Sequence, residues 1–418
     1  MISVISKSAL IAANLLYSAS LMAQSATIEA AQDSAQQVFS ACISDIQQKA
    51  ETAGIDKTVI SYALDDVKQI DKVLEYDRNQ PEFVQTFPTY LNKRVTQWRI
   101  DKGREMLRKH KDLLNQLTQE YGVPAHYLIS FWGLETNFGS YKGKMPIIDS
   151  LATLACDERR SRFFTQELLT ALKLMQRENL KKDKMLGSWA GAMGHTQFMP
   201  SAYINYAVDG DNDGLVDLWD SEPDALSSAA NFLNKLGWKK GFIWGREVNL
   251  PANFDYSHAG KDSRKQLTQW SEFGVRKVND DKIPKSEIDA SLILPTGAKG
   301  PAFLVYSNFD VIMRWNNSES YALAVGYLAD RIIGKPEWAK SLPELPNYPI
   351  SQMIELQDGL NELGFDVGKA DGIMGPATRK GIRQFQLANN MLADGYPDQS
   401  VFISVQEAVN KSQKLDGV

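Results

Sequence analysis

The chain carries GVPAHYLISFWGLETNFG at residues 122–139, and this stretch predicts a helix with a proline in its first turn. Leu128, Phe131, Trp132 and Glu135 recur at helical spacing, so their side chains share one face of that helix. The stretch therefore predicts an apolar helix that carries one carboxyl group near its C-terminal end.

Glu135 is the first candidate for chemistry because its neighbours on this helix face are apolar. An apolar environment disfavours the charged form of a carboxyl group, which is the condition that a general acid at neutral pH needs. The spacing alone also fits a glutamate that caps a helix or forms an ion pair within the core. Both interpretations stay open at this point.

A second segment, GSWAGAMGHTQFMP at residues 187–200, combines small residues with polar and aromatic ones. The small residues let the backbone approach a ligand or another surface. Ser188 and Gln197 supply hydrogen-bonding groups and Trp189 supplies a flat face, a mixture that suits a sugar. A tightly packed helix and turn without a ligand fits the same residues. A serine-hydrolase elbow does not fit, because Ser188 stands one place too early for that motif.

A third segment, DGDNDGLVDLWD at residues 209–220, has the spacing of a calcium-binding loop. Asp209, Asp211 and Asp213 occupy the first ligand positions, and Asp220 stands at the twelfth, where glutamate is usual. Asp224 is an alternative closing ligand. The same residues also fit a turn whose aspartates only cap neighbouring helices, so a structural calcium ion stays one of two interpretations.

A fourth segment, RWNNSESY at residues 314–321, is polar and aromatic. Ser318 suits the N-cap of a following helix. Trp315, Asn316 and Tyr321 are candidates to line a polar groove.

Composition limits the class of protein. The chain has 418 residues, with 46 basic and 51 acidic side chains and a net charge of −5. This balance argues against a nucleic-acid partner, which usually requires a basic excess or stripe. The length predicts two or three domains, and an apolar share of 43% predicts a well-packed core. The four histidines and two cysteines are scattered, which argues against a zinc centre.

Helical spacing dominates the pattern and predicts a mainly α fold. Between residues 238 and 306, short apolar pieces alternate with proline and glycine, which predicts a small extended or β subregion. No internal repeat is evident. The expected elements are helices within 31–99 and over 96–121, 165–179, 225–236 and 318–333, and strands at 246–250, 290–294 and 302–306.

Four prolines between Lys335 and Pro349 predict a semi-rigid connector, because proline fixes φ and lacks an amide donor. A compact unit of about 60 residues follows it. The expected division is a signal peptide at 1–23, a catalytic domain at 30–340, a linker at 341–349 and a small domain at 350–412.

The first residues predict export. Lys7 is the only charged residue before Glu29, and the mainly apolar run from Ala9 to Met22 is too short for a membrane span of about 20 residues. We therefore expect a periplasmic protein with no transmembrane span after cleavage and no lipid anchor. Cys42 and Cys156 fit either a disulfide, as an oxidising compartment allows, or two separate buried thiols.

Taken together, the four segments resemble the lytic murein transglycosylases of the B type, glycoside hydrolase family 103. The similarity extends over most of residues 39–333, and its motifs are specific. The resemblance implies a lysozyme-like catalytic domain in which Glu135 is the catalytic acid and base. It also implies that the saccharide groove is lined by Ser188, Gln197, Trp315, Asn316 and Tyr321, with Trp315 standing where some members have tyrosine.

Residues 350–412 resemble a peptidoglycan-binding domain of the three-helix type. The similarity rests on LQDGL at 356–360, LGF at 363–365, ADG at 370–372, GPAT at 375–378 and IRQFQ at 382–386. Some relatives hold zinc through histidine, but this segment has no histidine, so no metal is carried over.

The resemblance also implies a reaction. Ordinary glycosidases need two carboxyl groups beside the scissile bond, whereas here one strong candidate stands without an evident partner at motif spacing. In this family Glu135 would protonate the oxygen between N-acetylmuramic acid and N-acetylglucosamine. It would then take the proton of the C6 hydroxyl, which closes onto C1 as a 1,6-anhydro end without consuming water. This is the activity of a carbon–oxygen lyase acting on a polysaccharide.

Two other functions stay open: a lysozyme-type hydrolase of the same bond and a catalytically silent wall-binding protein. No cofactor is expected for the chemistry. The expected partners are peptidoglycan glycan strands, with cell-wall synthesis proteins as a further class.

Overall fold

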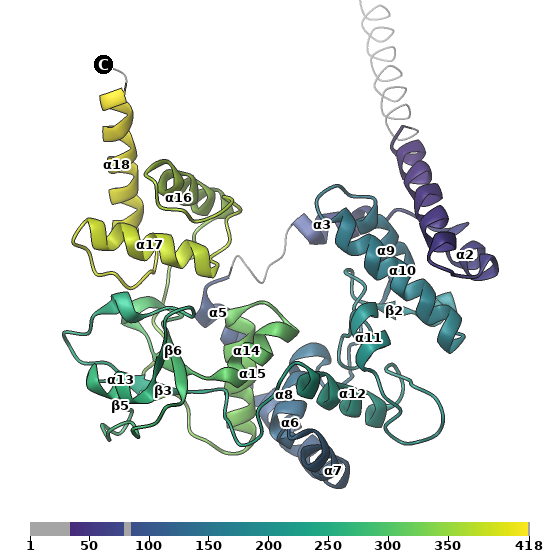
Figure 1. Ribbon diagram of the computed structural model, residues 1–418, viewed down its shortest axis with the longest axis horizontal. Coiled ribbons are helices and arrows are strands. Elements are labelled where there is room, and N and C mark those ends of the chain that lie inside the picture. Colours follow the sequence, from purple (N-terminus) through teal and green to yellow (C-terminus); the bar gives the residue numbers. More distant parts are fainter. Residues whose placement is uncertain (1–33, 79–84, 417–418) are drawn as a thin grey trace, which may run out of the picture. The chain divides into compact units, whose positions relative to one another are not determined.

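The computed structural model describes residues 34–78 and 85–416 (Figure 1). The expected signal peptide at 1–23 lies outside the described residues. Helices dominate the described chain, as the sequence predicts, and none of them is both long and apolar enough to cross a membrane. The chain forms two compact units. The first contains the N-terminal segment up to residue 77 together with residues 143–193 and 199–204. The second contains residues 78–142, 194–198 and 205–418.

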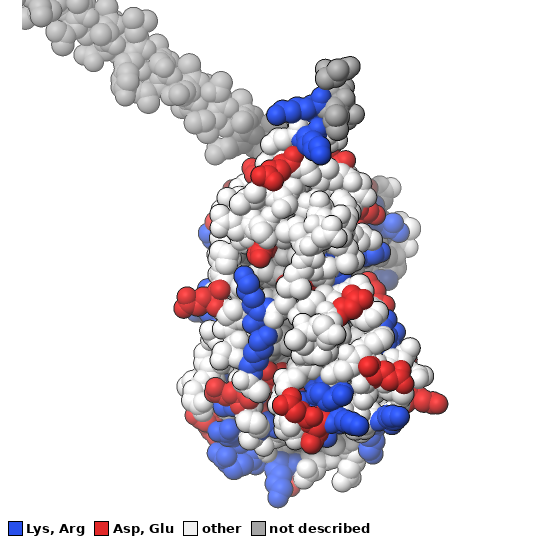
Figure 2. All heavy atoms as spheres, turned by 90° about the vertical axis from the view of Figure 1, so that its left-hand side faces the viewer, with Lys and Arg blue, Asp and Glu red and all other residues white. Residues whose placement is uncertain are grey.

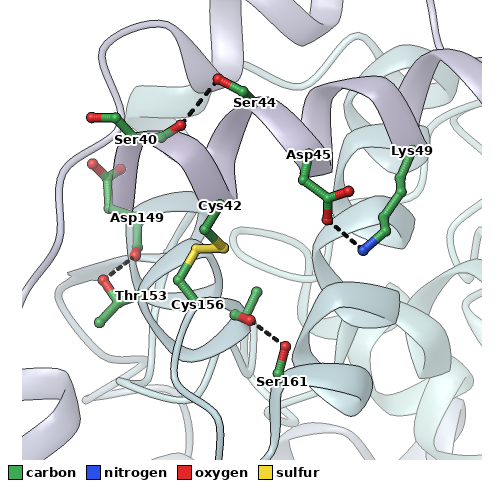
Figure 3. The surroundings of a disulfide bond; sticks show 10 residues. Ser40, Cys42, Ser44, Asp45, Lys49, Asp149, Thr153, Cys156 and Ser161 are labelled. Carbon is green, nitrogen blue, oxygen red and sulfur yellow. Dashed lines mark hydrogen bonds and ion pairs between the residues drawn. A yellow bond between two sulfur atoms is a disulfide. The ribbon is translucent and has the colours of Figure 1, made fainter. Parts of the chain in front are cut away.

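The first unit is a group of helices tied together by a disulfide. Cys42, on a helix that is described from residue 34 to 52, is bonded to Cys156 at the end of α9 (Figure 3). Of the two interpretations left open for these cysteines, the disulfide is therefore the one that the structure has. The other main elements of this unit are α2 (Lys57–Leu64), α3 (Asp71–Arg78), α9 (Ile147–Ala155), α10 (Ser161–Glu178) and the short pair β1 (Met145–Pro146) and β2 (Leu186–Gly187).

The second unit is built around α8 (Ala125–Thr136), the helix predicted from the decisive stretch. It packs against α6, α7, α12 and α15, and every residue from Tyr127 to Leu134 is buried. The sequence predicted that only one face of this helix is buried. In the structure the surrounding helices bury it on all sides. These neighbours and the remaining helices are α5 (Phe87–Arg94), α6 (Gln97–Lys109), α7 (Lys111–Tyr121), α12 (Glu222–Lys235), α14 (Ser307–Trp315) and α15 (Glu319–Ile332).

The helix predicted over 96–121 is wrong as a single element, because the structure has two helices there. His110 interrupts it with φ −103° and ψ 23°, ending α6 and preceding α7. Its ring packs edge-on against Trp132, with ring centroids 5.5 Å apart. The helical spacing of apolar residues continues across the break, so the sequence pattern does not show where one helix ends and the next begins.

The predicted β subregion is confirmed as an antiparallel sheet in the order β4-β6-β7-β3-β5. The three predicted strands form its centre, and two short edge strands were not predicted. Its own apolar cluster includes Trp270 on α13 (Leu267–Glu272). The strands are β3 (Gly245–Asn249), β4 (Arg264–Gln266), β5 (Arg276–Lys277), β6 (Asp289–Ile293) and β7 (Ala302–Val305).

The connector before the small domain has no helix or strand from residue 335 to 349, as the prolines predict. It is nevertheless held against the second unit. The Trp338 ring packs on Tyr327, with centroids 4.2 Å apart, and the amides of Ala339 and Lys340 donate to the Glu247 carboxylate at 2.6 and 2.8 Å. The connector therefore packs against the second unit through an aromatic contact and two backbone hydrogen bonds.

The small domain has the predicted three helices, α16 (Ile350–Glu362), α17 (Pro376–Ala388) and α18 (Gln399–Asp416). Two buried glutamines organise its turns in the same way. The Gln357 side-chain oxygen accepts from the Gly372 amide at 2.7 Å, and that of Gln386 accepts from the Gly395 amide at 2.8 Å. Both glycines follow an Ala-Asp pair, so the domain contains a short structural repeat that the sequence analysis missed.

Charges of both signs are spread over the molecule. Figure 2 shows one face, on which Lys and Arg side chains are interspersed with Asp and Glu.

Candidate active site

Glu135 lies at the C-terminal end of α8, where the buried helix reaches the surface of the core. The chain turns sharply just after it, since Asn137 and Phe138 have φ values of 50° and 59°. A β-carbon at Gly133 would lie 2.7 Å from the Phe138 ring, so glycine there lets the chain fold back. The turn leaves Glu135 partly exposed while its neighbours are buried.

Two aromatic donors converge on one oxygen of Glu135. The Trp315 indole N–H donates to Oε1 at 3.0 Å, and the Tyr321 hydroxyl donates to the same oxygen at 2.5 Å. Burial, followed by the charge of Glu135, raises the pKa of Tyr321 well above its usual value, so this phenol stays a neutral donor. Phe131 packs against Trp315 with ring centroids 4.5 Å apart. The carboxyl group is therefore held in a fixed orientation.

Glu135 faces a polar hollow of about 170 Å³. Larger hollows exist elsewhere in the second unit, but they lack this carboxyl group. Four segments that are distant in the sequence meet here, and they bring Gln197, Asn316 and Tyr321 to the same hollow, as the resemblance implied. The lining residues are Tyr90, Arg94, Leu134, Glu135, Gln197, Asn316 and Tyr321.

Gln197 is fixed by the backbone around it. It has φ 50°, and its amide nitrogen donates to the carbonyls of Gly194 at 2.9 Å and Lys142 at 3.1 Å. Because the nitrogen is used in this way, the amide oxygen is the group that Gln197 can present to a ligand's hydroxyl or N–H group. Asn316 follows α14 in an extended conformation and lines the same hollow.

The sequence analysis missed Tyr90 and Arg94, which α5 contributes to the hollow. Arg99 fixes this helix end, since its guanidinium donates to the Arg94 carbonyl and to the Asn137 side chain. Burial lowers the pKa of Arg99 to about 10. No motif in the sequence marks these residues, because they approach Glu135 only through the packing of α5, α6 and α8.

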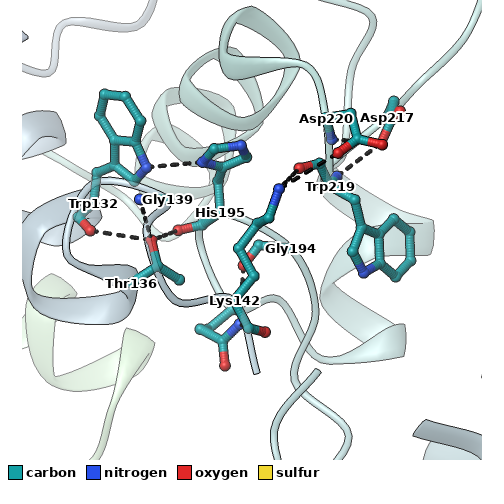
Figure 4. Close-up of polar contacts among 10 residues, drawn as sticks. Trp132, Thr136, Gly139, Lys142, Gly194, His195, Asp217, Trp219 and Asp220 are labelled. Atoms are coloured by element: carbon teal, nitrogen blue, oxygen red, sulfur yellow. Dashed lines mark hydrogen bonds and ion pairs between the residues drawn. The ribbon is translucent and has the colours of Figure 1, made fainter. Parts of the chain in front are cut away.

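His195 forms a buried support beneath the helix end (Figure 4). Its Nδ1 accepts from the Trp132 indole at 3.0 Å, and its carbonyl accepts from the Thr136 hydroxyl at 2.7 Å. Burial, and next the charge of Lys142, lower the pKa of His195 to about 4, so the ring is neutral at pH 7. A β-carbon at Gly139 would lie 2.2 Å from this ring, which explains the glycine.

Ser188 belongs to the first compact unit, whereas Glu135 belongs to the second. Its hydroxyl accepts from the amides of Ala190 at 3.3 Å and Ala192 at 3.0 Å. Within its own unit Ser188 therefore stabilises a turn of the small-residue segment.

The acidic loop brings its first three predicted ligands together. Carboxylate oxygens of Asp209, Asp211 and Asp213 lie within 4.8 Å of one another. Gly214, the sixth loop residue, has φ 92°, as the sharp turn of a calcium loop requires. Asp220 lies outside the cluster, since its side chain is 86% exposed and pairs with Lys142 at 3.5 Å.

Asp224, the alternative closing ligand, is buried at the foot of this loop. It accepts from the amides of Gly210 at 2.8 Å and Asp217 at 2.7 Å. Burial raises the pKa of this carboxyl group, and the charge of Asp211 adds to the effect. Asp224 therefore fixes the loop through its backbone.

The second unit thus presents one oriented carboxyl group, Glu135, in a polar hollow at the end of a buried helix. The transglycosylase SLT domain family matches residues 38–330, and the peptidoglycan-binding domain family matches residues 351–402. The chain therefore belongs to the lytic transglycosylase family, whose enzymes act on peptidoglycan, and it carries a peptidoglycan-binding domain.

Individual relatives agree with this assignment. The chain is 31% identical over 302 residues to the membrane-bound lytic murein transglycosylase B of Escherichia coli, covering 69% of this chain and 81% of the relative. Its structure is similar to SltB3 of Pseudomonas aeruginosa in complex with NAG-anhNAM-pentapeptide, with 43% identity, a TM-score of 0.83 and coverage of 88% and 99% of the two chains. The Escherichia coli transglycosylase Slt35 in complex with calcium is 31% identical, with a TM-score of 0.60 over 70% of this chain and 92% of that one.

Proposed function

We propose that Glu135 is the single acid and base with which this enzyme cleaves the bond between N-acetylmuramic acid and N-acetylglucosamine. The observation that carries the proposal is the composition of the hollow. Among the described residues that line it, Glu135 is the only carboxylate. A hydrolase of the ordinary type needs a second carboxylate to activate water or to act as nucleophile.

In the first step Glu135 gives its proton to the glycosidic oxygen while an oxocarbenium-like sugar forms. The carboxylate that remains is stabilised by the hydrogen bonds from Trp315 and Tyr321 to Oε1. In the second step this carboxylate removes the proton of the sugar's own C6 hydroxyl, whose oxygen bonds to C1. The proton balance closes, and no water is consumed.

Gln197 and Asn316 would position the sugar through hydrogen bonds to its hydroxyl and acetamido groups. Trp315 acts on the carboxyl group and offers an aromatic surface beside it. We assign Ser188 a saccharide contact only by its motif position, and its hydrogen bonds within a turn fit a supporting role equally well.

Digestion of purified murein in water enriched in heavy oxygen tests the reaction. The proposal predicts 1,6-anhydro ends without incorporated label by mass spectrometry. Reducing ends that carry the heavy isotope would identify a hydrolase. An inactive chain that binds sacculi would identify a wall-binding protein.

We propose that the chain divides functionally into a catalytic part at 30–340 and a wall-binding part at 350–412, joined by the linker at 341–349. The small domain has its own apolar core, which supports this division. A chain that ends at Leu345 should still release anhydro products from soluble glycan strands but should sediment less with sacculi. Equal sedimentation of the two chains would contradict a wall-binding role for the small domain.

We also propose that the chain is exported to the periplasm by the segment 1–23, which is cleaved and leaves no lipid anchor. The Cys42–Cys156 disulfide supports an oxidising compartment. Fractionation of cells that express the full chain, with N-terminal sequencing of the mature protein, tests this. Retention in the cytosol at full length would refute it.

A structural calcium ion in the loop 209–220 is a further part of the proposal. The residues fit such an ion, because three carboxylates converge and glycine occupies the turn. Asp209, Asp211 and Asp213 would hold it. The ion would neutralise their mutual repulsion and would take no part in bond cleavage.

A further inference from the structure

A second hollow in the same compact unit, of about 330 Å³, lies where the small domain meets the region of the antiparallel sheet. Lys261 and Ser263 line it from the sheet side, and Arg379 and Arg383 of α17 line it from the small domain. The function proposed above uses none of these side chains. The hollow is lined by side chains of both charges, with Glu319 and Asp394 beside the two arginines.

Arg383 is the unusual member of this hollow. Its guanidinium makes no hydrogen bond or ion pair with any residue that the structure describes, and its Nε atom is buried without a partner. The backbone approaches it from both sides, since a β-carbon at Gly260 would lie 3.2 Å from Nη1 and one at Gly395 would lie 2.9 Å from Nη2. A charge in this position is costly unless an anion accompanies it.

Among the described residues, the carboxylates that line the hollow, Asp262, Glu319 and Asp394, form no ion pair with Arg383. Asp394 accepts from the Ala298 amide at 2.9 Å through Oδ2 and from the Gln386 side chain at 3.0 Å through Oδ1. Glu319 pairs with Arg379 at 3.7 Å. Burial, and next the charge of Arg379, lower the pKa of Arg383, while the charges of Asp394 and Glu319 act in the opposite direction without pairing with it.

The hollow is connected to the catalytic site through the start of α15. Glu319, in its first turn, lines the Arg383 hollow, while Tyr321 donates to Glu135. A further groove of about 370 Å³ lies between the two sites. It shares Glu319 and Arg379 with the Arg383 hollow and is also lined by Asn317, the neighbour of Asn316 in the catalytic hollow.

We propose that Arg383, assisted by Arg379, binds a carboxylate of the peptide stem that the muramic acid carries. A planar guanidinium suits a carboxylate because it donates two parallel hydrogen bonds. The acetylated sugars of a strand are uncharged, and the lactyl carboxyl group of a stem-bearing muramic acid is an amide, so the stems supply the carboxylates. This inference rests on the proposed function, because it assumes that the strand occupies the groove beside Glu135.

The test measures binding of two soluble ligands to the full chain in a Glu135→Gln background, which prevents turnover. One ligand is a glycan oligomer that carries pentapeptide stems with free carboxylates, and the other is the same oligomer with these carboxylates converted to neutral amides. The parent should prefer the ligand with free stem carboxylates. Arg383→Gln should reduce this preference by about tenfold, because hydrogen bonds between charged groups are lost. The matched control Lys369→Gln, an exposed lysine of the same domain, should keep the parent's preference.

The melting temperature gives a second readout. Removal of an unpaired, largely buried charge should raise the melting temperature of Arg383→Gln above that of the parent without ligand, and stem-bearing ligand should narrow the difference. An unchanged preference in Arg383→Gln would overturn the proposal. If Arg383→Gln does not fold, Arg383→Lys keeps the charge and should lose part of the preference, and full retention would overturn the proposal equally. Cleavage by Glu135→Gln at the parent rate would instead contradict the proposed function.

Discussion

Glu135 and the cluster Asp209, Asp211 and Asp213 place carboxyl groups in opposite surroundings. Glu135 ends a helix that is buried on all sides, and aromatic side chains donate to its oxygen. In the acidic loop the donors are backbone amides: the Asn212 amide donates to Asp209 at 2.7 Å and the Leu215 amide donates to Asp213 at 2.8 Å.

The difference separates a chemical role from a structural one. A carboxyl group at the edge of an apolar core can exchange its proton with a ligand and then be stabilised as an anion by fixed donors. Carboxylates at the surface that accept backbone hydrogen bonds fix a turn, and a cluster of them suits a calcium ion. The two regions should therefore respond differently to loss of charge.

Glu135→Gln should produce the largest effect, a loss of anhydro-product formation of at least about 10²–10⁴-fold, because the general acid and base is removed. The melting temperature should change little, since glutamine is similar in size. Release of soluble muropeptides measures the rate. Glu272→Gln, at an exposed position of the same unit, is the matched control and should stay fully active. Parental activity in Glu135→Gln would refute the assignment.

Tyr321→Phe should lower turnover by about 10- to 100-fold, because one charge-assisted hydrogen bond to Glu135 is lost while the ring stays packed. The loss should appear in kcat rather than KM if the bond stabilises the carboxylate formed during the reaction. Tyr327→Phe, on the same helix but outside the hollow, provides the comparison. A change confined to KM would indicate that Tyr321 only binds sugar.

The His195 support should make the catalytic region sensitive to acid. Its pKa in the folded chain is about 4, below the ordinary 6.5, so the unfolded chain binds the proton first. The free energy of unfolding should be unaffected above pH 6.5 and should fall as the pH drops from 6.5 towards 4, by at most roughly 3 kcal/mol from this residue. Melting curves over this range measure it. If His195→Gln shows the same pH slope as the parent, another group is responsible.

Calcium should produce the smallest effect, a rise of a few degrees in melting temperature with little change in turnover, because a ligand of the folded state stabilises it by mass action. Asp211→Asn combined with Asp213→Asn should abolish the rise. Asp262→Asn combined with Asp289→Asn, which carries the same charge change outside the loop, should retain it. Identical melting curves in chelator and in millimolar calcium would leave only the turn-forming role of these aspartates.

Prediction from sequence succeeded where local pattern decides structure. The helix within residues 122–139, the central strands and the Ser318 cap follow from spacing and turn chemistry, and the structure has all of them, the helix as Ala125–Thr136. It failed where a distant contact decides. The break at His110, whose ring packs on Trp132, is not visible in the helical spacing. The repeat in the small domain rests on two buried glutamines whose flanking sequences differ.

By itself, the sequence determined the helical class, the two domain families and Glu135 as the residue to test, because these depend on residue types at short spacing. Only the tertiary structure decided which groups meet Glu135. Tyr90 and Arg94 reach the hollow from α5. Trp315 and Tyr321, which lie 180 and 186 residues after Glu135, donate to its carboxyl group. The unpaired state of Arg383 is likewise a property of packing, because a sequence specifies charges but does not state which of them find partners.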